Sequence, residues 1–309
     1  MLKKTSFLTV GICTKNSEAT IAKTLESIAS QDFPLKNVDI IIVDGGSKDG
    51  TLKTINGFLK KTNIKGRIFF DEGAGLGSAR QIILDNVRGE YILWLDSDVV
   101  LAPDFINQQL SFLEKRPRAG LVRGKAYFTE SRALIADIQN LLFCSIDVVY
   151  LGATIGRVEA LRQVGGFDKR IKGASEDVDI KIRLFMHNWI YLINERAIFF
   201  HTPKNTLRNI FKQYSWYGHG EHFLHHKYSG FLKIPYRLPP IFFGWGLKVS
   251  KRSYKNNYKK KSFLVPLLCL FIGVCWCLGF LKAHIEGYGH SIKRPEIKLF
   301  TSKRLHKNE

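Results

Sequence analysis

The first two-thirds of the chain alternate between short apolar, β-rich runs and segments with helical periodicity. The β-rich runs fall at residues 7–14, 39–44, 67–71, 91–95 and 121–128. Between the first four runs, apolar side chains recur three or four residues apart, as at Ile21, Leu25 and Ile28. This spacing indicates amphipathic helices. Strands that alternate with helices predict an α/β fold, in which helices cover both faces of a mostly parallel sheet.

Polar side chains gather where these strands end. In open α/β sheets, ligands bind beyond the carboxyl ends of the strands. The first four strands are followed by Thr14-Lys15-Asn16-Ser17-Glu18, Asp44-Gly45-Gly46-Ser47, Asp71-Glu72-Gly73 and Asp96-Ser97-Asp98. Each of these ends carries a carboxylate or an amide. We therefore expect one polar site at this edge of the sheet.

Asp96 and Asp98 follow the apolar strand YILWL. Alternate residues of an extended segment point the same way, so the two carboxylates can flank one site. Two like charges this close are unfavourable unless a cation neutralises them. Carboxylate and phosphate oxygens suit Mg²⁺ or Mn²⁺, so the pair predicts a divalent metal site. The alternative is a solvated turn, because Asp-x-Asp recurs often by chance.

Asp44 stands at the end of a strand and precedes two glycines and Ser47. An acidic residue in this place can accept a hydrogen bond from a nucleobase or a ribose hydroxyl. It can equally cap its own turn, and both interpretations stay open. The glycine-rich segment 73–77 opens the helix that carries Arg80. Its N–H groups can face phosphate, or the glycines can serve only a tight turn.

A second acidic cluster, Glu176-Asp177-Val178-Asp179, opens a later helix. Acidic residues in a first helical turn complement the helix dipole without any further function. Three acids within four residues exceed what capping requires. If this segment lies over the site of Asp98, Asp177 or Glu176 can take a proton from an attacking hydroxyl.

Six segments in order resemble the family 2 glycosyltransferases with the GT-A fold, over about residues 7–220. They read TKNSE, VDGGSKDGT, GLGSAR, LDSDV, GGFD and SEDVD. The resemblance implies inverting transfer from a UDP-, GDP- or dTDP-linked sugar, with Mn²⁺ or Mg²⁺ as cofactor. The catalytic domain is expected over residues 1–230 and a membrane-associated tail over 231–309.

The resemblance also implies roles for individual residues. The donor-binding residues that it implies are Thr14, Asn16, Glu18, Asp44, Arg80 and Asp96. Asp98 and Asp96 bind the metal and the diphosphate. His201, at the end of a strand-like run, either completes the metal shell or is packed at a strand end. Asp177, ahead of Glu176, is the expected general base.

Two departures from the family narrow the expected acceptor. Processive synthases of the family carry Q-x-x-R-W, whereas residues 213–217 read QYSWY, so we predict no polymerisation. Polyprenyl-phosphate sugar synthases carry a D-L-Q-H-P-P type segment, whereas residues 98–103 read DVVLAP. A glycan or lipid-linked saccharide acceptor is therefore favoured. The alternatives are a polyprenyl-phosphate glycosyltransferase and a non-catalytic membrane-bound nucleotide-sugar binder.

The tail contains an uncharged apolar run, residues 263–281. Its length approaches the ~20 residues that cross a bilayer, and basic clusters at both ends argue against a soluble core helix. We expect a spanning or re-entrant segment near 262–281. The shorter patch 239–249 is expected to be interfacial. Because basic residues are denser before the run, the catalytic domain is expected on the cytoplasmic face of the membrane.

Charge and cysteine usage support this placement. The net charge is +20, and residues 248–309 contain 14 basic and 3 acidic residues. Such a basic tail suits an anionic membrane surface or a nucleic acid. Its position beside an apolar run favours the membrane, and we expect no nucleic acid partner. The five cysteines lack paired zinc-ligand spacing and are expected to be reduced, and the first residues do not read as a signal peptide.

Overall fold

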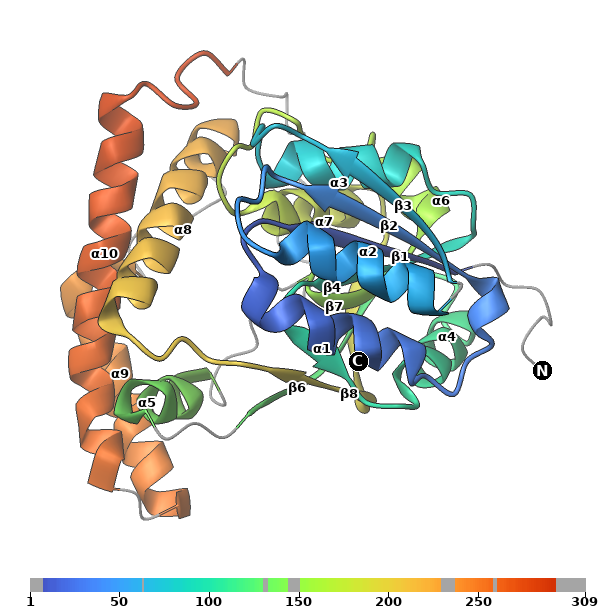
Figure 1. Ribbon diagram of the computed structural model, residues 1–309. Coiled ribbons are helices and arrows are strands. Elements are labelled where there is room, and N and C mark those ends of the chain that lie inside the picture. Colours follow the sequence, from blue (N-terminus) through green and yellow to red (C-terminus); the bar gives the residue numbers. More distant parts are fainter. Residues whose placement is uncertain are drawn as a thin grey trace.

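The computed structural model describes residues 8–62, 64–129, 133–143, 151–228, 237–257 and 260–292. A single mixed sheet lies between two layers of helices in the described part of the chain (Figure 1). A further group of helices, late in the chain apart from α5, stands at one side of this sandwich. This side layer is drawn in gold, orange and red, with α5 in green.

The sheet has eight described strands. They are β1 (Leu8–Thr14), β2 (Val38–Asp44), β3 (Lys65–Phe70), β4 (Tyr91–Asp96), β5 (Val99–Leu101), β6 (Ala119–Phe128), β7 (Ala153–Arg157) and β8 (Ile190–His201). Their order across the sheet is β3-β2-β1-β4-β7-β6-β8-β5. The pairs β1–β2, β1–β4, β2–β3 and β6–β8 are parallel, whereas β4–β7, β6–β7 and β5–β8 are antiparallel. The expected α/β sheet is confirmed, with its parallel strands concentrated in the N-terminal half.

Helices cover both faces of the sheet, as the sequence predicts. One face packs against α1 (Glu18–Ala29), α2 (Thr51–Thr62) and α4 (Phe105–Glu114). The other face packs against α3 (Leu76–Asp85), α6 (Val158–Gln163) and α7 (Glu176–Met186). A short 3₁₀ turn, η1 (Leu35–Asn37), precedes β2.

The central strands are apolar throughout because both of their faces are buried. In β2, Ile40 and Ile42 belong to the core beneath α1, whereas Ile41 and Val43 belong to the core beneath α3. Successive side chains of a strand point to opposite faces, so a continuous apolar run supplies both cores at once. This burial fixes the register and therefore the position of the polar residues that follow each strand.

The side layer consists of four helices and a 3₁₀ turn. They are α5 (Leu134–Phe143), α8 (Leu207–Lys227), α9 (Pro239–Asn257), η3 (Lys260–Leu264) and α10 (Val265–Ile285). Thr206 caps α8, because its hydroxyl accepts a hydrogen bond from the N–H of Asn209 at 3.2 Å. Among the described helices, residues 260–285 form one that is long and apolar enough to cross a membrane, with a mean hydropathy of 2.5 and half of its apolar window buried.

The backbones of α8 and α10 are in close contact. A Cβ added at Gly279 would lie 1.9 Å from the carbonyl oxygen of Ser215, and one at Gly218 would lie 2.0 Å from that of Trp276. Glycines at both crossing points permit this approach. The expected domain boundary at residue 230 falls outside the described residues, and the division into 1–230 and 231–309 stays a prediction.

Candidate active site

The polar ends of β1, β2 and β4 lie side by side. These strands are parallel neighbours, and their register pairs Thr14 with Asp44 and Cys13 with Asp96. The loops after β1 and β4 also touch, since the hydroxyls of Ser17 and Ser97 are 2.8 Å apart. The structure thus brings the expected strand-end residues to one edge of the sheet.

Arg80 joins this edge to the start of α7. It extends from α3, and its side chain is only 5% exposed. Its Nη2 lies 3.4 Å from Oδ1 of Asp96, and its Nε lies 3.2 Å from Oε1 of Glu176. Burial alone would lower the pKa of Arg80, but the two carboxylates outweigh it and keep the pKa above its ordinary value. A buried guanidinium needs such partners, so Arg80 holds two parts of the site together.

Glu176 and Asp177 begin α7 and face the same region. The Glu176 side chain is 3% exposed. Burial raises the pKa of Glu176 to about 8, against the opposing charge of Arg80. Burial also raises the pKa of Asp177, which accepts a hydrogen bond from the N–H of Val178 at 2.8 Å. Asp177 is partly exposed, whereas Glu176 is enclosed beside Arg80.

Asp98 lies between β4 and β5. Its Oδ2 is 3.5 Å from Nε2 of His201 and 3.2 Å from Nζ of Lys204. Burial opposes ionisation, but the hydrogen bonds and charges of His201 and Lys204 prevail and hold the pKa of Asp98 well below its usual range. His201 pairs with Val99 across β8 and β5, which explains how it reaches Asp98. The ionised carboxylate of Asp98 is an oxygen ligand of the kind that Mn²⁺ and Mg²⁺ prefer, and the His201 imidazole beside it can add one nitrogen ligand.

Asp44 is almost fully buried within its own turn. Its carboxylate accepts hydrogen bonds from the N–H groups of Gly46 at 3.0 Å and Ser47 at 2.8 Å, and from the Ser47 hydroxyl at 2.5 Å. These contacts explain Asp44 as a residue that stabilises its own turn. A contact between Asp44 and the nucleotide-sugar donor stays a prediction. Neighbouring Thr14 has a buried hydroxyl without a hydrogen-bond partner in the described structure.

Asn16 and Glu18 tie the loop after β1 to the loop after β2. Asn16 accepts a hydrogen bond from the N–H of Lys48 at 2.8 Å, and Glu18 accepts one from the N–H of Gly50 at 3.0 Å. Glu18 is exposed. Both side chains therefore shape the edge of the site through backbone contacts.

Two glycines of the segment 73–77 permit close backbone packing. An added Cβ at Gly75 would lie 2.6 Å from Cα of Lys172, and one at Gly77 would lie 2.4 Å from the carbonyl oxygen of Asp168. The segment 168–172 leads into Glu176 and Asp177. These glycines thus allow that loop to lie against the start of α3, and a phosphate contact is not needed to explain them.

The sequence did not single out Lys204 or Tyr217. Burial raises the pKa of Tyr217, and the charges of Asp177 and Asp96 add to this effect, so Tyr217 of α8 lies near these two carboxylates. Lys204 follows His201 after a short turn, but Asp98 is 106 residues away in the sequence. Contacts across such distances leave no pattern in a single sequence.

The fold and the site define a glycosyltransferase of the GT-A type, and two family models agree. One described as "Glycosyl transferase family 2" matches residues 9–163, and one described as "Glycosyl transferase family group 2" matches residues 91–282. The chain belongs to glycosyl transferase family 2.

Curated relatives are similar in sequence. Poly-beta-1,6-N-acetyl-D-glucosamine synthase of Staphylococcus epidermidis is 26% identical over 223 residues, which cover 67% of this chain and 52% of that protein. Poly(ribitol-phosphate) beta-N-acetylglucosaminyltransferase TarS of Staphylococcus aureus is 31% identical over 102 residues, which cover 33% of this chain and 18% of that protein. The matched residues span about half of the length of the first relative and about a fifth of the length of the second.

Solved structures share the fold. The mannosyltransferase PcManGT from Pyrobaculum calidifontis, in complex with GDP-Man and Mn²⁺, superposes with a TM-score of 0.65 at 15% identity, covering 92% of this chain and 88% of that one. S. aureus TarS 1–349 in complex with UDP-GlcNAc superposes with a TM-score of 0.52 at 15% identity, covering 92% of this chain and 91% of that one. At these identities the likeness concerns the fold.

Proposed function

We propose that this enzyme transfers a sugar, with inversion, from a nucleoside diphosphate donor to a hydroxyl of a glycan or lipid-linked saccharide. The observation that carries the proposal is the meeting of two acidic groups at one edge of the sheet. Asp96 ends β4, Asp98 lies in the turn that follows, and Arg80 connects Asp96 to the start of α7, where Asp177 lies. A metal-binding pair beside a separate carboxylate suits diphosphate departure and hydroxyl activation together.

Donor binding is assigned to the loops after β1 and β2. Thr14 and Asp44 face the base and ribose, and Asn16 and Glu18 keep the loops in place. UDP-GlcNAc is the first donor to test, because two relatives are named for N-acetylglucosamine polymers or transfer and one structural neighbour holds UDP-GlcNAc. GDP-Man, bound to the other neighbour, is the second.

Asp98, Asp96 and His201 are the residues that would hold Mn²⁺ or Mg²⁺. A bound divalent cation offsets the charge that develops on the leaving diphosphate. Lys204 contacts the same oxygen of Asp98 as His201 does. Lys204 would have to leave this oxygen if the carboxylate held a cation, and its ammonium group would then be free to contact the diphosphate.

Asp177 takes the proton of the acceptor hydroxyl. Its raised pKa makes it a better proton acceptor than an ordinary aspartate, since the conjugate acid is more stable. Arg80 keeps Glu176 and Asp96 in place on either side. One displacement at the anomeric carbon then inverts its configuration. A single transfer is proposed, in keeping with the absence of Q-x-x-R-W at residues 213–217.

Membrane attachment is assigned to α10. Its apolar side chains that face away from the other helices are Leu267, Leu270, Val274, Leu278, Leu281 and Ile285. Both ends of the segment contact the rest of the protein: Lys261 pairs with Asp137 of α5, and the Tyr288 hydroxyl accepts a hydrogen bond from the N–H of Lys172. We propose that the exposed face of α10 enters the membrane while the opposite face stays packed on α8, with the catalytic part on the cytoplasmic side.

The proposed reaction is tested by a donor panel. The protein, purified in detergent, is incubated with Mn²⁺, a glycan or lipid-linked saccharide acceptor, and UDP-GlcNAc, GDP-Man or a dTDP-sugar, and nucleoside diphosphate release is measured. We expect release from one donor and its loss when the cation is chelated. Turnover that persists in excess chelator would contradict the proposed need for a divalent cation. Release that stays at the enzyme-free rate with every donor would contradict the proposed sugar transfer.

A further inference from the structure

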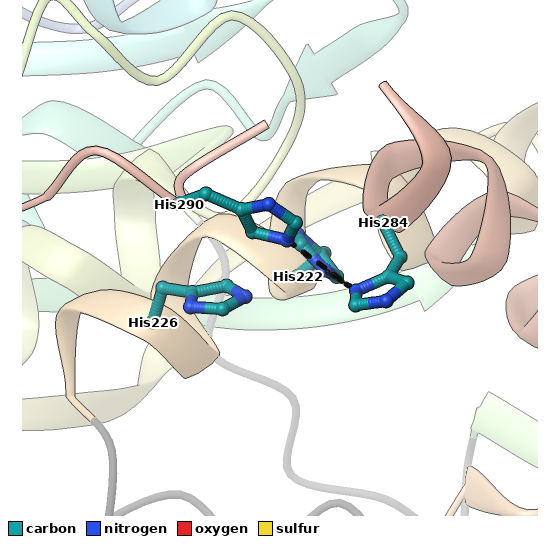
Figure 2. A group of neighbouring side chains, drawn as sticks. All are labelled: His222, His226, His284 and His290. Atoms are coloured by element: carbon teal, nitrogen blue, oxygen red, sulfur yellow. Dashed lines mark hydrogen bonds between the residues drawn. The ribbon is translucent and has the colours of Figure 1, made fainter. Parts of the chain in front are cut away.

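Four histidines meet where the end of α10 packs against α8 (Figure 2). His222 and His226 are four residues apart on α8 and so share one face of the helix. His284 lies near the end of α10, and His290 lies in the turn that follows. One ring nitrogen from each of the four lies within 4.8 Å of the others.

Two pairs of ring nitrogens already have the spacing of a tetrahedral site. Nε2 of His222 is 3.3 Å from Nδ1 of His284, and Nε2 of His290 is 3.4 Å from the same atom. In a tetrahedral zinc site with Zn–N bonds of about 2.0–2.1 Å, neighbouring ligand nitrogens are about 3.3–3.4 Å apart. The fourth histidine, His226, is partly exposed, and its ligand nitrogen lies within 4.8 Å of the other three.

His222 is oriented as a metal ligand. It is fully buried, and its Nδ1 lies 2.7 Å from the carbonyl oxygen of Tyr288. A carbonyl only accepts hydrogen bonds, so Nδ1 carries the proton and the lone pair of Nε2 faces the other histidines. A backbone carbonyl that fixes the tautomer in this way is the usual partner of a metal-binding imidazole.

The ring nitrogens of the cluster also bring several lone pairs close together, and the neutral imidazole is the form that binds a metal. Nδ1 of His284 carries at most one proton, yet it lies beside two other ring nitrogens. A cation between the rings satisfies all of these lone pairs together.

We propose that His222, His226, His284 and His290 bind one Zn²⁺ ion in a four-coordinate structural site. Imidazole nitrogens suit Zn²⁺, whereas Mg²⁺ and Mn²⁺ prefer oxygen ligands. This site is therefore distinct in ligand chemistry from the carboxylate site around Asp98. Four protein ligands leave no open position, which is typical of a structural ion.

The ion would hold the C-terminal turn against the catalytic part. Tyr288 lies in the chain between His284 and His290. Its hydroxyl accepts a hydrogen bond from the N–H of Lys172 at 2.7 Å and donates one to the carbonyl of Arg170 at 3.2 Å. The same loop packs on the start of α3 and leads into Asp177. Zinc would thus stabilise both the packing of α8 on α10 and the loop that precedes the catalytic acids.

The proposal is tested with full-length protein purified without a histidine tag or a metal-affinity column. After chelation, Co²⁺ is titrated as a spectroscopic probe, and Zn²⁺ then displaces it. We expect one ion per chain, the visible absorption of tetrahedral cobalt, and a melting temperature that rises with Zn²⁺ and falls with chelator. His284→Ala and His290→Ala, both at exposed positions, should weaken binding by about tenfold or more, because even partners of metal ligands have effects of this size.

Two controls separate this site from the others. His187→Ala removes an exposed histidine outside the cluster and should leave Zn²⁺ binding unchanged. Asp98→Asn should strongly impair transfer but retain Zn²⁺, so failure of the proposed reaction and failure of this site are distinguishable. Absence of tetrahedral cobalt absorption in the wild type, or equal Zn²⁺ affinity in the wild type and the His284 and His290 variants, would overturn the proposal.

Discussion

Glu176 is a carboxyl group enclosed beside the guanidinium of Arg80. Its pKa rises from 4.5 to about 8 on folding. Between these two values the folded state holds more protons than the unfolded state, so the free energy of unfolding falls as pH rises from about 4.5 to 8. The pairing with Arg80 reduces this penalty without removing it.

Replacing Glu176 by Gln should flatten this pH dependence. The amide does not ionise, so the variant should lose less stability than the wild type between pH 5 and pH 8. Melting temperatures of both proteins across this window provide the measurement, and the exposed Glu195→Gln should behave as the wild type. If melting temperature changed equally with pH in the wild type and in Glu176→Gln, Glu176 would be ionised over the whole range from pH 5 to pH 8.

At the residue scale, the acidic strand ends could be predicted from the sequence but their partners could not. Asp96 and Asp98 follow a buried apolar strand, which fixes their place at the edge of the sheet. Lys204 reaches Asp98 only because β8 pairs with β5, and Arg80 reaches Glu176 only because α3 and α7 cover the same face. The four-histidine cluster likewise depends on how α10 packs, which periodicity does not reveal.

At the scale of elements, the crossing of α8 and α10 depends on two glycines. Gly279→Ala should separate the helices, because the new Cβ would lie 1.9 Å from the carbonyl oxygen of Ser215. We expect a loss of about 1–3 kcal/mol in the free energy of unfolding, as for other overpacked sites. Gly244→Ala on α9 is the matched control, since nothing lies within 4 Å of its added Cβ. Denaturant unfolding measures both, and equal stability of the two variants would contradict the close crossing.

The sequence predicts the strands that have a long apolar run, but it does not predict the short strands β5 and β7. The strands β1, β2, β3, β4 and β6 match predicted runs. Four of them supply fully buried side chains to the core, and the edge strand β3 packs its partly buried Ile68 and Phe69 against it. The strands β5 and β7 have three and five residues, too few for a periodic pattern. Their antiparallel pairing makes the sheet mixed, which a pattern of alternating strands and helices does not foretell.

At the scale of the whole molecule, α10 lies at the outer edge of the side layer (Figure 1). Its exposed side chains include a series of large apolar residues. Val274 and Leu278 are 43% and 49% exposed, one turn apart. Introducing lysine at both positions should move the protein from the membrane pellet to the supernatant, because charged groups are costly in hydrocarbon. Phe70→Lys on β3, 59% exposed, should leave sedimentation unchanged. Release of the wild type by high salt alone would instead assign attachment to the basic residues.

The proposed reaction requires Asp98, in the turn after β4, and Asp177, at the start of α7, to act on the same donor and acceptor. Nucleoside diphosphate release is the most direct measurement, for Asp98→Asn, Asp177→Asn and the control Glu195→Gln under saturating donor and Mn²⁺. We predict that Asp177→Asn loses about 10²–10⁴-fold in turnover, as expected for a general base, that Asp98→Asn is comparably impaired, and that Glu195→Gln is unaffected. If both aspartate variants kept wild-type turnover, with their fold intact by circular dichroism, the roles proposed for Asp98 and Asp177 would be wrong.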